Sequence, residues 1–415
     1  MRWRANRPWL RSQRRSRGFK SHHLHLLQVF ATCLIHRSVI RVAISLWALG
    51  FATVAFATPA SAQEQPASDG NRVDPEKGTV DGSPLDDLPK HITLLSDTGV
   101  RPDWSPNGKQ LVILEGAPLG DVAIIDVKTG RKRTVTKHFE HRGFGRAYFL
   151  HNGDLLLCGP TSGPQPSSER PEAGRFMGVM SVLRAPFKGE PQPLGVSCWE
   201  GMATSDRSMR IAWNRSDIDY TDDDLGDRVV NGVSEIWSAV VRYRAGRAYL
   251  SDIERVAERN AVSPAAVLEA QDFRGPKDKE LIFTAYAHQG GEVMGAERGG
   301  EIANGSATNY SNSPVYEEVE GIAPDGSYAL VERDVESAAI PGPLDIWRLR
   351  LDGSGKFERL TFFNRYRGGY YASNPAFSPD GETIAFQLSI DGPVEGAGQG
   401  ILLFDVETFD EAAGS

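Results

Sequence analysis

The clearest structural signal in this chain is a short turn motif that is present in two nearly identical copies. They read Trp104-Ser105-Pro106-Asn107-Gly108-Lys109 and Phe377-Ser378-Pro379-Asp380-Gly381-Glu382. Proline presets φ for a turn, Asn or Asp bonds back to its own backbone, and Gly accepts a positive φ. A β-forming run follows each copy, at Gln110–Leu114 and at Thr383–Gln387. The motif therefore predicts a tight turn between two short strands.

Weaker forms of the same turn recur along the chain after residue 91. The turn is clear at Ala323–Gly326, weaker at His151–Asp154, and degenerate at Ser205–Ser208 and Pro276–Lys279. A second marker, a glycine followed by a charged residue, closes an alternating apolar run at intervals of 54 to 59 residues. Its copies begin at Gly130, Gly189, Gly246, Gly300 and Gly355. A fixed period of this length indicates a repeat architecture.

Six copies of about four short strands each predict an all-β fold, a six-bladed β-propeller over residues 91–415. One four-stranded unit cannot bury both of its faces, whereas blades stacked around an axis can. The sixth unit has three strand candidates and no fourth. Ile92–Ser96 precedes the first unit and is similar to Phe357–Thr361, the fourth strand of the fifth unit. We therefore expect Ile92–Ser96 to pair with the last blade and close the ring.

The turn motif, followed by a β-run and then by a Thr-Gly or Leu-Thr strand, resembles the WD40-like repeat of the TolB family. The resemblance covers residues 92–407 and implies a periplasmic interaction platform. TolB itself has an α/β domain before its propeller, and here we expect only a linker, so no TolB partner or binding residue is carried over. The repeat also resembles prolyl oligopeptidase propellers, which need a hydrolase domain with Gly-x-Ser-x-Gly. Gly195-Val196-Ser197-Cys198-Trp199 lacks the final glycine, so no residue qualifies as catalytic.

The N-terminal segment has the pattern of an export signal. Arg37 and Arg41 precede an apolar run over residues 42–57, and an Ala-x-Ala site ends at Ala62. We expect residues 1–62 to be a basic leader with a signal peptide and residues 63–90 to be a flexible linker. An uncleaved anchor is disfavoured, because a membrane span needs roughly 20 apolar residues. As an alternative, translation starts nearer Val39 or Val42, and the basic stretch before the apolar run is not part of the protein.

The charge of the chain is unevenly distributed. Its net charge is −8, but residues 1–62 hold 10 Lys and Arg and no acid, so the remainder carries −18. An exported domain this acidic repels phosphate, which argues against nucleic-acid binding. We expect a monomer in the periplasm or secreted, not membrane-spanning after cleavage, with a protein or cell-envelope partner. Cys158 and Cys198, placed in adjacent units, form either a disulfide or two buried thiols.

Metal-binding chemistry has little support in the sequence. His138, His141 and His151 lie near one another in sequence, but solvated loop histidines explain them better than a metal site does. The acidic loop Asp217–Asp227 has clustered carboxylates that suit Ca²⁺, yet its spacing does not match an EF-hand. We therefore expect no cofactor and no assigned metal ligand, with Ca²⁺ at this loop as the open alternative.

A ligand site in a propeller is expected at the mouth of its central channel. Aligning the units on their turns places Val319 and four polar residues at one level, and three more polar residues lie just before the last inner strand. The polar candidates are Arg101, Arg146, Glu200, Asn374, Arg365, Tyr370 and Tyr371. This set suits a polar or acidic ligand. We expect a binding or scaffold module, and the alternative is a channel-mouth enzyme, a metal-dependent lyase or hydrolase acting on saccharide or peptide.

Overall fold

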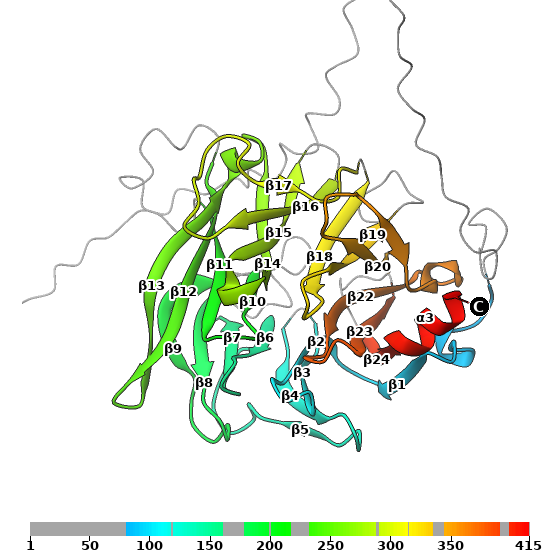
Figure 1. Cartoon of the computed structure of the whole chain (residues 1–415). Coiled ribbons are helices and arrows are strands. Elements are labelled where there is room, and N and C mark those ends of the chain that lie inside the picture. Colours follow the sequence, from blue (N-terminus) through cyan, green and yellow to red (C-terminus); the bar gives the residue numbers. More distant parts are fainter. Residues whose placement is uncertain are drawn as a thin grey trace, which may run out of the picture. The chain divides into compact units, whose positions relative to one another are not determined.

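The computed structural model describes residues 80–117, 119–160, 178–198, 201–216, 232–287, 290–313, 315–334, 344–390 and 398–414. These residues form six four-stranded antiparallel sheets, the blades of a β-propeller (Figure 1). Blade 1 contains β2 (Val100–Trp104), β3 (Gln110–Glu115), β4 (Asp121–Asp126) and β5 (Lys132–Thr134). Blade 2 contains β6 (Arg146–Phe149), β7 (Leu155–Gly159), β8 (Gly178–Leu183) and β9 (Gln192–Cys198). Blade 3 contains β10 (Met202–Thr204), β11 (Arg210–Ser216), β12 (Ser234–Arg244) and β13 (Arg247–Glu258).

The second half of the ring repeats this order. Blade 4 contains β14 (Val267–Arg274), β15 (Glu280–Ala287), β16 (Gly290–Glu297) and β17 (Thr308–Asn309). Blade 5 contains β18 (Tyr316–Ile322), β19 (Tyr328–Asp334), β20 (Asp345–Arg350) and β21 (Phe357–Arg359). Blade 6 contains β22 (Tyr370–Phe377), β23 (Thr383–Ile390), β24 (Gly398–Asp405) and β1 (Ile92–Ser96). Short 3₁₀ turns are η1 (Pro84–Asp86), η4 (Arg259–Ala261), η5 (Pro276–Asp278) and η6 (Phe363–Arg365).

The first strand of each blade lies at the centre of the ring. β2, β6, β10, β14, β18 and β22 contact one another in this order, and β22 contacts β2 again. The chain therefore closes into a circle, and the predicted six-bladed architecture is confirmed. We call the region bounded by these six inner strands the ring centre.

The strand that closes the ring is the one expected from the sequence. β1 pairs antiparallel with β24, with Ile92 opposite Phe404 and Leu94 opposite Leu402. The last blade is thus built from both ends of the repeat region, which leaves no unpaired third strand. Just before β1, Val80 accepts a hydrogen bond from the Arg367 amide at 2.8 Å, so residue 80 already contacts the ring.

The hydrophobic core lies between neighbouring blades and not within any one of them. Among the described residues, six buried apolar clusters each combine side chains from two adjacent blades. Trp104 and Leu111 of blade 1, for example, pack with Ile401 of blade 6. Each blade therefore depends on both neighbours for burial, as expected for a repeat unit that is not stable alone.

The predicted turns join the first and second strands in all six blades. In blade 6 the Thr383 amide donates to Ser378 Oγ at 3.0 Å, and Gly381 has a φ of +78°. A Cβ at Gly381 would lie 3.2 Å from Pro324 Cδ, in the equivalent turn of blade 5. Turns of neighbouring blades therefore pack closely on one face of the ring.

The sequence did not indicate the helix α3 (Val406–Gly414), which follows the last strand. Phe409 lies 5.2 Å from the His91 ring and 5.1 Å from Phe404, measured between ring centroids. Arg348 Nη2 donates to Asp410 Oδ1 at 2.7 Å. Val406 and Phe409 are one turn apart and face the ring, but two apolar residues are too few to predict a helix. None of the helices in the described residues is long and apolar enough to cross a membrane.

Candidate functional site

At four blade junctions, a polar side chain from the second strand of one blade fixes the inner strand of the next. The side-chain oxygen accepts a hydrogen bond from a backbone amide of that inner strand. The pairs are Asn214 with Ala270 (2.9 Å), Thr284 with Val319 (3.0 Å), Glu332 with Asn374, and Gln387 with Arg101 (2.7 Å). The four acceptors are buried. Arg101, Val319 and Asn374 thus occupy one structural level, which is where the turn alignment places them.

Four inner strands are irregular at this level. The pairing register shifts within β2, β14, β18 and β22, next to Arg101, Gln271, Glu320 and Asn374 respectively. Arg101 has a φ of +55° and Asn374 a φ of +51°, a left-handed conformation that non-glycine residues rarely adopt. Bulges redirect side chains and are common beside functional sites. These bulges therefore indicate that the candidate functional site lies at this level of the ring centre.

One of the four junctions carries a charge. Asn, Thr and Gln supply neutral oxygens at three of them, whereas blade 5 uses the carboxylate of Glu332. Glu332 is 4% exposed and also accepts from Asn374 Nδ2 at 3.1 Å. Because a neutral oxygen accepts the equivalent hydrogen bond at the other three junctions, this contact does not require a charged side chain.

Three carboxylates meet at this position. Glu318, Glu320 and Glu332 each place a carboxylate oxygen within 4.8 Å of the others, and we call them the carboxylate triad. Glu318 and Glu332 are cross-strand partners on β18 and β19, and Glu320 follows Glu318 by two residues. Within the described chain, this is the one group of three His, Cys, Asp or Glu side chains that converges closely enough to ligate a metal ion.

Two tyrosines and a fourth glutamate border the triad. Tyr316 donates its hydroxyl to Glu318, and Tyr286 donates to Glu269 Oε2 at 3.0 Å. The two tyrosine rings are stacked with centroids 6.2 Å apart. Burial, followed by the charge of Glu269, raises the pKa of Tyr286 well above its usual range. Both tyrosines therefore stay protonated and act as hydrogen-bond donors.

Burial and repulsion between like charges raise the pKa values of two triad members, Glu320 and Glu332. Burial and the charges of Glu332 and Glu318 raise the pKa of Glu320 well above its ordinary value. Burial and the charge of Glu318 raise the pKa of Glu332 to about 8. Desolvation penalises the ionised form, and like charges at short range penalise it further. At neutral pH Glu320 and Glu332 therefore retain their protons unless a cation replaces them.

Two arginines, Arg101 on blade 1 and Arg146 on blade 2, lie within electrostatic reach of the triad. Arg101 Nη1 donates to Asn374 Oδ1 at 3.1 Å, so the Asn374 amide connects this guanidinium to Glu332. The positive charge of Arg146 partly offsets the raised pKa of Glu320. Arg101, Arg146 and Asn374, three of the residues proposed from the sequence, thus gather around acids that the sequence reading did not single out.

The remaining sequence candidates have other surroundings. Arg365 lies in η6, with its guanidinium 5.3 Å from the Tyr366 ring. Tyr370 packs against the core between blades 5 and 6, and Tyr371 pairs with Ser389. Glu200 and the whole Asp217–Asp227 loop lie outside the described residues. The signal that would have found two triad members is the alternation Tyr316, Glu318, Glu320 at the start of a predicted inner strand.

The histidines do not form a common site. His138 Nε2 lies 2.9 Å from the Gly189 carbonyl, and His151 Nδ1 lies 2.5 Å from the Asp206 carbonyl. His141 Nε2 lies 3.1 Å from Asp121 Oδ1, and its Nδ1 accepts from the Gly143 amide. Each histidine thus serves a separate local contact.

Cys158 and Cys198 form a disulfide with a Cα–Cα distance of 5.9 Å. The expectation that they lie in adjacent units is wrong, because both belong to blade 2, on β7 and β9. The outer strand β9 extends to residue 198, further than the repeat spacing suggests. The bond therefore ties the second strand of this blade to its outermost strand.

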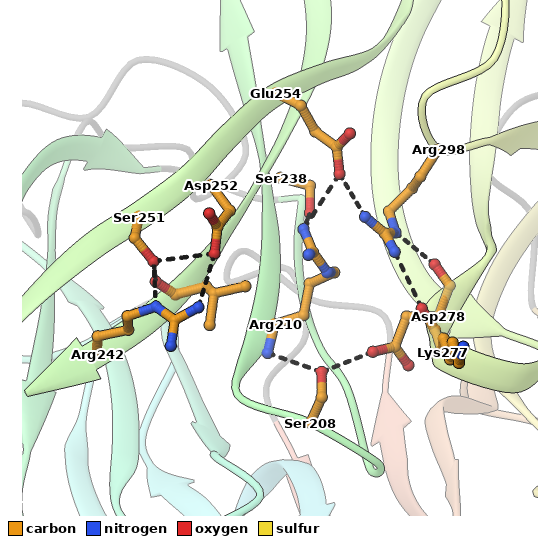
Figure 2. A network of polar contacts seen from close by, with 11 residues as sticks. Ser208, Arg210, Ser238, Arg242, Ser251, Asp252, Glu254, Lys277, Asp278 and Arg298 are labelled. Carbon is orange, nitrogen blue, oxygen red and sulfur yellow. Dashed lines mark hydrogen bonds and ion pairs between the residues drawn. The ribbon is translucent and has the colours of Figure 1, made fainter.

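A polar network joins the outer parts of blades 3 and 4 (Figure 2). Glu254 Oε1 accepts from Arg210 at 3.1 Å and also from Arg298. Asp278, 1% exposed, accepts from Ser208 Oγ at 2.6 Å. Arginines and carboxylates here neutralise one another, in contrast to the triad. We interpret this network as a clamp between blades.

Comparisons with known proteins give likenesses of fold. No family model matches the chain, and no curated protein sequence matches it. Among solved structures, it is similar to the gluconolactonase XC5397 from Xanthomonas campestris (TM-score 0.46, 11% identity, 76% of this chain and 89% of that chain). It is also similar to a TolB candidate from Agrobacterium tumefaciens (TM-score 0.30, 14% identity, 73% and 72%) and to the tricorn protease (TM-score 0.45, 14% identity, 75% and 26%). These similarities assign neither a family nor an activity.

Proposed function

We propose that the protein is an exported binding propeller that holds a divalent cation at its ring centre and binds a protein or envelope component there. The observation that carries the proposal is the convergence of Glu318, Glu320 and Glu332 within 4.8 Å. Carboxylate oxygens are the ligands that hard cations such as Ca²⁺ prefer. The triad shifts the expectation from an acidic ligand to a cation, because three converging carboxyl groups offer oxygen ligands.

Electrostatic repulsion within the triad supports a cation as the natural occupant. Two unit charges 4.8 Å apart repel by roughly 3 kcal/mol at an effective dielectric constant of 20. The repulsion is relieved either by protons, as the raised pKa values of Glu320 and Glu332 indicate, or by a bound cation. A divalent ion would displace those protons and bring the carboxylates together.

The charge of Glu332 supports the same proposal from the internal symmetry of the ring. Blade 6 performs the equivalent junction contact with Gln387, whose Oε1 accepts from the Arg101 amide at 2.7 Å. Glu332→Gln therefore keeps the structural acceptor and removes only the charge. A substitution of this kind separates ligand binding from folding better than a change to alanine.

Calcium titration of the full chain, after chelator treatment, tests the proposal by calorimetry and by thermal unfolding. We expect Ca²⁺ to bind the wild-type protein and to raise its melting temperature as a ligand of the native state does. Glu320→Gln should abolish both effects. Glu382→Gln, which changes an exposed carboxylate beside α3, is the matched control and should retain both. Wild-type protein that neither binds nor is stabilised by Ca²⁺, Mn²⁺ or Mg²⁺ would refute the cation site.

A second candidate is a metal-dependent lyase or hydrolase acting on saccharide or peptide. Arg101 next to the triad favours it, because a guanidinium beside a cation suits the binding of a substrate carboxylate. A bound cation would supply Lewis-acid polarisation of the substrate. Turnover of uronic-acid polysaccharides or peptides by the Ca²⁺-loaded wild type, lost in Glu320→Gln, would establish it. Cation binding without turnover leaves the binding module as the function.

Export into the periplasm or medium is part of the proposal. The signal-like pattern ending at Ala62 and the disulfide between Cys158 and Cys198 support it, because disulfides persist in oxidising compartments. N-terminal sequencing of protein recovered from cell fractions is the test. A mature N-terminus at Gln63 in the periplasm or medium is expected, and full-length protein in the cytoplasm would contradict export.

A further inference from the structure

The hairpin of β12 and β13 has a cationic tip. The two strands span 11 and 12 residues and pair as far as Arg244 opposite Arg247. Arg210, the first residue of β11, pairs with Val240, so the last residues of β12 pair only with β13. Figure 1 shows this hairpin at the outer edge of its blade. We call residues 242–249 the arginine tip.

One face of the arginine tip is exposed and cationic. Arg242, Arg244, Arg247 and Tyr249 are cross-strand or alternate neighbours, and all four are exposed. Like charges directly opposite each other destabilise a hairpin, and Arg244 faces Arg247. Within the described chain neither residue makes an ion pair, so no structural contact compensates for their repulsion. Arg242 is bonded to Ser251 Oγ at 2.7 Å and to Asp252 Oδ2 at 2.9 Å.

The opposite face of the tip holds it rigidly against blade 2. Tyr243 donates its hydroxyl to Asp154 Oδ2 at 2.5 Å, and the Arg184 guanidinium lies 4.9 Å from the Tyr243 ring. The Ala248 amide donates to Gln192 Oε1 at 2.8 Å. The turn itself has two residues, Ala245 and Gly246, with φ of +49° and +79°, as in a type I′ hairpin. The arginines are therefore presented on a fixed support.

We propose that the arginine tip docks the protein onto an anionic phospholipid surface. Arginine matches phosphate oxygens through paired donors, and the tip contains arginine and no lysine. Tyr249, 41% exposed beside Arg242, is the amphipathic kind of side chain that favours a membrane interface. The chain outside the leader carries a net charge of −18, so an anionic surface repels most of the molecule. The cationic tip is therefore the part that we expect to contact such a surface.

The test uses the full chain and vesicles of phosphatidylglycerol and phosphatidylcholine in equal parts. Because the basic leader also attracts such vesicles, the informative readouts are a matched pair of variants and hydrogen exchange at the tip. Arg244→Glu with Arg247→Glu should weaken vesicle binding by at least about tenfold. Lys128→Glu with Arg131→Glu makes the same charge change at the equivalent hairpin end of blade 1 and should leave binding within about twofold.

Hydrogen exchange locates the contact independently of the leader. In the wild type, vesicles should slow exchange of the backbone amides at Gly246 and Arg247, and inorganic phosphate or phosphatidylcholine alone should not. Equal loss of binding in both variants, or unchanged exchange at the tip, overturns the proposal. Protection of the tip by polyglutamate as strong as that by vesicles also overturns it and assigns the tip to an acidic protein.

Discussion

Glu332→Gln should change how the stability of the protein depends on pH. Burial and the charge of Glu318 raise the pKa of Glu332 to about 8 in the folded protein, whereas a glutamate in an unfolded chain titrates near about 4.3. Between these two values the folded state binds more protons than the unfolded state. The free energy of unfolding therefore falls as pH rises through this window, the reverse of the usual behaviour of a salt-bridged carboxylate.

The size of the effect follows from the same shift. A pKa unit corresponds to about 1.4 kcal/mol, so Glu332 alone sets a ceiling of about 5 kcal/mol between acidic and alkaline pH. Glu320 also has a raised pKa, so replacing Glu332 alone relieves only part of the electrostatic destabilisation. We expect the Gln variant to be about 2 kcal/mol more stable than wild type near pH 9 and nearly equal to it near pH 5.

Thermal unfolding of chelator-treated protein across this pH range measures the difference. The variant keeps the oxygen that accepts from the Asn374 amide, as Gln387 does for Arg101 in blade 6. Glu382→Gln is the control, and its pH profile should follow that of the wild type. If Glu332→Gln and wild type show the same pH dependence of stability, the triad is not under electrostatic strain.

Three further predictions concern the ring itself. Reducing the Cys158–Cys198 disulfide, which closes a sequence separation of 40 residues, should lower the free energy of unfolding by about 4 kcal/mol, and a Cys198→Ser variant should not respond to reductant. Proline at both Thr93 and Leu94 should remove the hydrogen bonds of β1 and expose the β24 amides to exchange, whereas Leu94→Ser should not. Thr361→Val should cost about 2 kcal/mol in urea unfolding, because Thr361 Oγ1 accepts from the Ile346 amide at 2.9 Å and donates to Asp345 Oδ1 at 2.6 Å. An unchanged unfolding midpoint, or unchanged exchange in the proline variant, would contradict the corresponding prediction.

The fold is readable from the sequence because its signals are local. One hairpin is indicated by each of the turns at Gly108 and Gly381 and by the glycine at Gly246. The period at which such markers recur indicates the number of blades. Ring closure also has a sequence signature, since the last unit lacks one strand and Ile92–Ser96 supplies it. Helix α3 is not part of the repeated pattern, and two apolar residues, Val406 and Phe409, are too few to predict it.

Only part of the candidate site can be predicted from the sequence. The site depends on contacts between the second strand of one blade and the innermost strand of the next blade. Aligning inner strands finds Arg101 and Asn374, and the alternation of Glu318 and Glu320 is visible once β18 is known to be innermost. Glu332 lies on a second strand and reaches the ring centre only because it fixes the amide of Asn374 in the next blade. This contact joins two different blades, and no fixed spacing of residues in the sequence indicates it. The location of both cysteines in one blade was missed for a similar reason, the extra length of β9.

The metal content of the full chain decides whether the carboxylate triad holds a cation. The protein would be dialysed against Ca²⁺, freed of unbound ion and analysed by mass spectrometry, beside a Glu318→Gln, Glu320→Gln double variant. We expect a stoichiometric ion in the wild type and no ion at the ring centre of the variant. Wild-type protein without bound ion, or equal metal content in both proteins, would contradict it.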